Sequence, residues 1–160
     1  MNGEIRALQA EIEADLEAIA EIYAALDRYG DRLDTEEGRI AAAYYLHNLY
    51  NAFENIFRRV AATFGNRVTS ESGWHADLPR RMRLDIPGVR PHLISAAAYD
   101  YLDELRRFRH IFRSAYRLER DADRLILVLK KAQALREIYR AEIAQFLSFL
   151  DELLSAPPSP

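Results

Sequence analysis

One segment of the chain gathers the side-chain types that phosphodiester chemistry requires. Residues 105–117 contain five arginines and one histidine. On a helix that turns by about 100° per residue, most of these basic side chains form one stripe, and Arg109 and Tyr116 lie on its border. We define the basic stripe as Arg106, His110, Arg113 and Arg117 together with Arg109.

These residue types fit metal-free cleavage of RNA. Such a reaction needs a base for the ribose 2′-hydroxyl, an acid for the leaving oxygen and cations for the charged transition state. Histidine transfers protons near neutral pH, and arginine binds phosphate oxygens through a planar fork of N–H groups. Arg109, His110 and Arg113 supply both types within about one helical turn. The alternative interpretation is a solvated basic face without a ligand.

The positive charge of the basic stripe requires negatively charged groups nearby. Like charges four residues apart on a helix destabilise it, and the nearest acids, Asp103, Glu104 and Glu119, stand only at the ends of the segment. We therefore expect either carboxylates from elsewhere in the fold or an anionic ligand to face the stripe.

A second group of polar residues occurs between residues 44 and 55. One helical face carries His47, Asn51 and either Glu54 or Asn55. This face is more polar than the core of a helical bundle requires. One interpretation is a hydrogen-bonded layer that fixes helix register. The other is a second wall for the basic stripe, with Glu54 as its counter-charge. The sequence leaves both open.

Composition limits the class of protein. The 160 residues fit one domain, the net charge of −3 argues against a protein that coats nucleic acid, and a local basic groove remains compatible with it. The absence of cysteine excludes a disulfide scaffold and a thiolate metal site, and is compatible with the cytoplasm. No apolar run approaches the roughly 20 residues that span a bilayer. We expect no metal, no cofactor and no membrane partner.

Apolar residues recur every three or four positions, which predicts an all-α protein. We expect one domain over residues 1–154, an antiparallel bundle of four long helices with one short helix. Thr35 is the expected N-cap of the second helix, and self-association of the bundle is expected. The predicted segments are a long helix at 1–30, a helix at 36–64, a connection at 67–91 with a short helix near 72–82, a basic helix at 95–117, a last helix at 121–154 and a flexible tail at 155–160.

Three stretches resemble the HEPN superfamily, and within it the HepT-like toxins. They are residues 44–56 (YYLHNLYNAFENI), residues 74–82 and residues 108–116 (FRHIFRSAY). The resemblance covers about residues 40–154 and implies an all-α homodimer that cleaves RNA without metal. The family motif is an arginine, a polar residue and, a few positions later, a histidine. In HepT-like members a tyrosine follows two residues on, and a nucleotidyltransferase antitoxin adenylylates it.

The motif transfers to this chain with one departure. Its arginine is Arg109, its polar residue is His110 and its tyrosine is Tyr116, but the histidine position holds Ser114. Three explanations stay open. His110 performs the proton transfer; or the domain binds RNA or a nucleotide without cutting it; or Ser114 is a substitution introduced to silence a toxic protein.

The resulting hypothesis is a cytoplasmic HepT-like toxin, a ribonuclease neutralised by adenylylation (AMPylation) of Tyr116. Arg109, His110, Arg113 and Ser114 form its candidate catalytic group, and Arg106, Arg117, Asn51 and Glu54 its candidate RNA-binding group. A non-catalytic HEPN module that binds RNA, a nucleotide or a nucleotidyltransferase is the second hypothesis. A structural bundle whose arginines pair with a partner's acids is the third.

Overall fold

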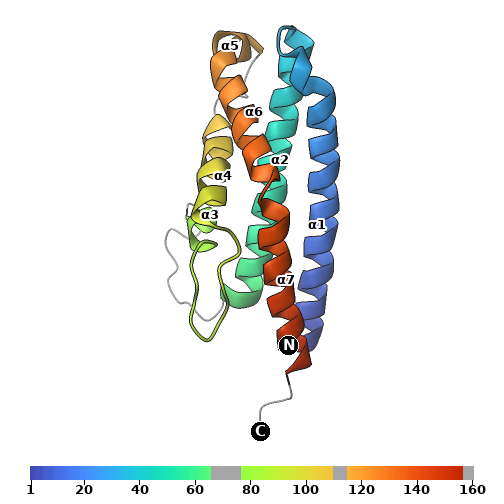
Figure 1. Ribbon diagram of the computed structural model, residues 1–160, viewed down its shortest axis with the longest axis vertical. Coiled ribbons are helices and arrows are strands. Elements are labelled where there is room, and N and C mark those ends of the chain that lie inside the picture. The colour runs from blue at the N-terminus through green and yellow to red at the C-terminus, as the bar shows by residue number, and fades with distance from the viewer. Residues whose placement is uncertain (66–76, 110–114, 157–160) are drawn as a thin grey trace.

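The computed structural model describes residues 1–65, 77–109 and 115–156 (Figure 1). Within these ranges the chain is all-α, with no strand beyond one isolated bridge between Ile86 and Arg90. None of the described helices is long and apolar enough to cross a membrane. The elements are α1 (Asn2–Tyr29), the 3-10 turn η1 (Gly30–Arg32), α2 (Glu36–Phe64), α3 (Leu78–Arg81), α4 (Ala96–Phe108), α5 (Ala115–Arg120), α6 (Ala122–Arg136) and α7 (Tyr139–Ser155).

The two longest helices, α1 and α2, lie side by side along most of their length (Figure 1). The predicted helix at 36–64 coincides with α2, and Thr35 is its N-cap, because the Thr35 hydroxyl accepts a hydrogen bond from the Gly38 N–H at 3.0 Å. Arg59 of α2 joins the pair by binding Glu11 at 2.9 Å and Asp15 at 3.0 Å. These contacts hold α2 in place, and so they also fix the positions of the side chains on its other faces.

The predicted basic helix at 95–117 is shorter in the structure. Ser95 caps α4 by accepting from the Ala98 N–H, and α4 ends at Phe108, with Arg109 as its C-cap residue. Residues 110–114 lie outside the described ranges, and α5 then starts at Ala115. The short helix predicted near 72–82 is represented by α3, whose preceding residues 66–76 are also outside the described ranges.

The predicted last helix at 121–154 consists of two helices. At the junction of α6 and α7, the N–H groups of Glu137 and Ile138 bond to carbonyls three residues back instead of four. Tyr139, the first residue of α7, stacks on Tyr23 of α1, with ring centroids 5.7 Å apart. The Tyr23 hydroxyl donates to the Ala132 carbonyl at 2.7 Å, so α1 is bonded to α6 close to the junction.

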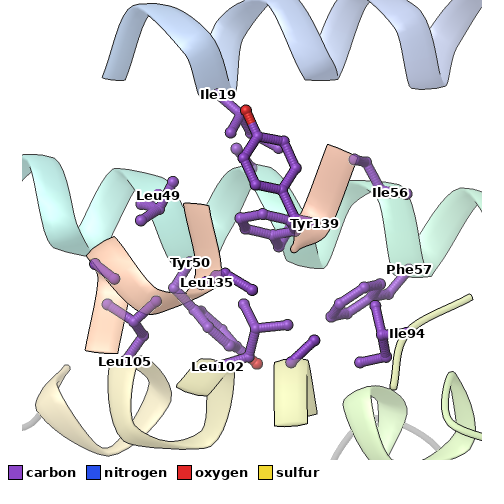
Figure 2. Close-up of a cluster of buried hydrophobic side chains, with 14 of the residues drawn as sticks. Ile19, Leu49, Tyr50, Ile56, Phe57, Ile94, Leu102, Leu105, Leu135 and Tyr139 are labelled. Carbon is purple, nitrogen blue, oxygen red and sulfur yellow. The ribbon is translucent and has the colours of Figure 1, made fainter. Parts of the chain in front are cut away.

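One hydrophobic core joins the long helices, and Figure 2 shows part of it. Most of its buried side chains come from α1, α2, α4, α6 and α7, and α3 and α5 contribute Leu78 and Leu118. Because the core holds α2 against α4, it also fixes which polar faces of these two helices meet at its margin. The labelled core residues include Ile19, Leu49, Ile56, Leu102, Leu105, Leu135 and Tyr139.

Candidate functional site

Arg109 stands at the end of α4 and contacts three neighbouring residues of α2. Its Nη2 donates to the Asn51 Oδ1 at 2.5 Å, and its Nη1 lies 3.2 Å from the Glu54 Oε2. The centre of its guanidinium lies 4.8 Å from the Tyr50 ring centroid, within cation–π range. We call Tyr50, Asn51 and Glu54 the arginine cradle. Asn51 and Glu54 are three residues apart and so project from the same side of α2.

The charge at the arginine cradle is not fully balanced. Glu54 also binds Arg58 of its own helix at 2.5 Å, so one carboxylate serves two guanidinium groups. Glu54 is largely buried, with 15% of its side chain exposed, whereas Arg109 is 37% exposed. The cluster therefore presents positive charge at a place that solvent reaches, which is where an anionic group can bind.

A local acid offsets part of the charge of the two arginines before Arg109. Asp103 binds Arg106 at 2.8 Å and Arg107 at 2.9 Å, and its hydrogen bond to Arg106 raises the pKa of that guanidinium. This corrects the expectation that nothing in the local sequence offsets the stripe. Asp103 precedes its partners by three and four residues, the spacing that brings helical side chains together. That spacing is visible in the sequence and could have identified the pairs.

One carboxylate from elsewhere in the fold faces the stripe, which is one of the two outcomes that we expected. Glu54 of α2 binds Arg109, and the predicted wall containing Asn51 and Glu54 is the face that receives it. Asn55, the alternative to Glu54, is exposed on α2. Glu104 of α4, one of the acids near the stripe, binds Arg124 of α6, which is not a residue of the stripe, at 2.8 Å.

Tyr50 is a member of the site that the sequence did not single out. Its side chain is buried, and burial, followed by the charge of Glu54, raises the pKa of its hydroxyl to about 12. Tyr50 is therefore neutral at physiological pH. Its ring closes one side of the guanidinium and thus holds the orientation of Arg109.

His47 lies on the same α2 face as the arginine cradle, one turn before Asn51. The side chain is half-buried, and burial together with the positive charge of Arg109 lowers the pKa of its ring. Both causes disfavour the protonated form. A larger fraction of His47 is therefore neutral near pH 7 than of a histidine whose pKa is unshifted.

The remaining candidates are placed as follows. His110, Arg113 and Ser114 lie outside the described residues, as do Trp74 and His75, so the contacts of these side chains are not part of the described site. Tyr116 falls in α5 one residue before Arg117, which is exposed. α5 packs against α2 and α6.

The fold and site define an all-helical protein with an arginine held between the polar face of one long helix and the end of another. A family model described as HepT-like protein matches residues 41–150, which is 110 of the 160 residues and includes nearly all of α2 and most of α7. The chain belongs to this HepT-like family. No curated protein and no solved structure shows significant similarity to it.

Proposed function

We propose that this chain is the toxin of a toxin–antitoxin pair, a metal-independent endoribonuclease that acts in the cytoplasm as a homodimer of HEPN-like bundles. Family membership over residues 41–150 supports the class of protein. The observation that carries the site is the position of Arg109, which is oriented by the arginine cradle yet remains partly exposed. A guanidinium has more N–H donors than these two contacts use, so a phosphate oxygen can still bind.

In the proposed reaction each basic residue has its own role. Arg109 binds the scissile phosphate, Arg113 stabilises the charge that develops on it, and His110 transfers a proton. Arg106 and Arg117 bind flanking phosphates. Asn51 and Glu54 act through Arg109 by fixing its orientation.

The non-catalytic alternative rests on one observation, the serine at position 114 where the family motif has histidine. In that case the same arginines bind RNA, a nucleotide or a partner nucleotidyltransferase without cleavage. RNA binding without turnover would then show a strong salt dependence, because phosphate contacts release counterions.

The test is cleavage of total tRNA by the wild type and by Arg109→Ala and His110→Ala. We expect each variant to lose at least about 100-fold in rate, the usual effect of removing a transition-state contact. Arg6→Ala, an exposed arginine of α1 outside the family match, is the control and should cleave normally. Unchanged cleavage in both site variants would contradict the role assignment. Salt-dependent RNA binding with no cleavage in the wild type would support the non-catalytic alternative.

A second prediction concerns the antitoxin. Incubation with a genomically adjacent nucleotidyltransferase and ATP should transfer one adenylate to the Tyr116 oxygen and release pyrophosphate. The added charge and bulk would hinder RNA binding near Arg109, so cleavage should fall as modification rises. Intact-mass spectrometry measures the gain, which should vanish in Tyr116→Phe and persist in Tyr44→Phe, since Tyr44 is an exposed tyrosine of α2. A gain that survives Tyr116→Phe would show that another residue is modified.

A further inference from the structure

The α2 face that holds Arg109 also carries a histidine. His47, Asn51 and Glu54 follow one another at spacings of four and three residues, so they lie along one side of the helix. Asn51 and Glu54 both contact Arg109, which identifies this side as the one that faces the end of α4. His47 is one turn from Asn51, about 6 Å along the helix axis.

The proposed cleavage has a role for such a group. Attack of the ribose O2′ on phosphorus forms one P–O bond and breaks the bond to the leaving O5′. The 2′-hydroxyl must lose a proton to a base while O5′ gains one from an acid, and one imidazole cannot be deprotonated and protonated at once. His110 has been assigned to one proton transfer, so the other transfer needs a second group.

We propose that His47 is the general base of this site and takes the 2′-hydroxyl proton of an RNA whose phosphate is bound by Arg109. This inference rests on the proposed function. The imidazole nitrogen receives the proton as the O2′–P bond forms, and the leaving O5′ receives its proton from His110. The products are a 2′,3′-cyclic phosphate and a 5′-hydroxyl, with no further reactant required.

The protonation state of His47 agrees with this role. A base must be neutral before the reaction, and both burial and the Arg109 charge lower the pKa of the ring. Glu54, two turns away on α2, offsets part of the Arg109 charge through their ion pair. The His47 side chain is half-buried on the α2 face that contacts Arg109, so it lies beside the guanidinium that would bind the phosphate.

The same histidine could instead serve only to hold α2 in register, and the experiment separates the two roles. His47→Gln keeps a hydrogen-bonding side chain of similar length but cannot exchange a proton at neutral pH. We expect it to bind RNA and unfold like the wild type, and to cleave total tRNA at least about 100-fold more slowly. His47→Ala should be equally slow and regain activity when imidazole is added.

His92 provides the matched control, because it is an exposed loop histidine bonded to Asp85 at 2.8 Å, remote in the chain from α2. His92→Gln should cleave normally. If His47→Gln cleaves at the wild-type rate while Arg109→Ala is inactive, the role of His47 is refuted and the proposed function stands. If the wild type cleaves no RNA, both the proposed function and this inference are refuted.

A second measurement covers the case in which His47 variants fold poorly. In the wild type, the ring signals of His47 in a proton–carbon NMR spectrum should shift when a 2′-O-methyl RNA oligonucleotide, which cannot be cleaved by this route, is added. The signals of His92 should stay unchanged. Unshifted His47 signals under conditions in which the oligonucleotide is bound would overturn the proposal.

Discussion

Gly38→Ala is expected to lower the free energy of unfolding by about 3 kcal/mol, the upper part of the range for overpacked sites. A methyl group at this position would lie 1.8 Å from the Arg32 carbonyl oxygen, which is backbone and cannot turn aside. That oxygen also accepts hydrogen bonds from the N–H and the hydroxyl of Thr35, at 3.1 and 2.9 Å. To admit the methyl group, the corner between α1 and α2 must open and these bonds must lengthen.

Urea unfolding followed by circular dichroism measures the effect. Gly3→Ala is a matched control, since nothing lies within 4 Å of the added methyl group. In a helix, alanine is also more favourable than glycine. We expect Gly3→Ala to equal the wild type or to exceed it by up to about 1 kcal/mol. Equal midpoints for the two variants would show that the corner adjusts without cost.

Phe53→Ala is expected to cost about 3–5 kcal/mol, because it empties a large site in the core. Phe53 is fully buried on α2, and its ring meets Tyr139 edge-on with centroids 5.5 Å apart. It also contacts Phe57 one turn further along. Phe53 lies between Asn51 and Glu54 in the sequence but on the core side of α2, so the cavity would form directly behind the arginine cradle.

Thermal unfolding of Phe53→Ala and Phe53→Leu tests this prediction. Leucine fills more of the space than alanine does and should restore a large part of the stability. Leu127→Ala is the control for loss of an apolar side chain, since Leu127 is 41% exposed on α6 and should change stability little. A Phe53→Ala protein as stable as Leu127→Ala would mean that the core closes around the cavity.

Much of the fold could be predicted because periodicity and capping act locally. The boundaries of α2 and its Thr35 cap follow from a threonine before two glutamates and from the spacing of apolar residues. The junction between α6 and α7 could not, since the apolar spacing continues through Glu137 and Ile138 without interruption. The Tyr23 contacts that accompany this junction join residues more than a hundred positions apart.

The contacts around Arg109 could be predicted in part for the same reason. The shared face of Asn51 and Glu54 is a local property of α2, and its contact with Arg109 was one of two interpretations that the sequence allowed. Which of them holds depends on the angle at which α4 meets α2, and the core sets that angle. Tyr50 was missed because a tyrosine on a buried helix face resembles an ordinary core residue until its ring is seen against a guanidinium.

The pairing of Glu54 with Arg109 has a consequence for the choice of ligand. Because the fold tethers this carboxylate beside the guanidinium, it competes for Arg109 at a high effective concentration. An isolated phosphate or mononucleotide would arrive from bulk solution and would have to share Arg109 with the negative charge of Glu54. A polymer already bound at neighbouring arginines presents its next phosphate at a comparable effective concentration. Glu54 would thus make the site prefer polynucleotides to mononucleotides without any contact to a base.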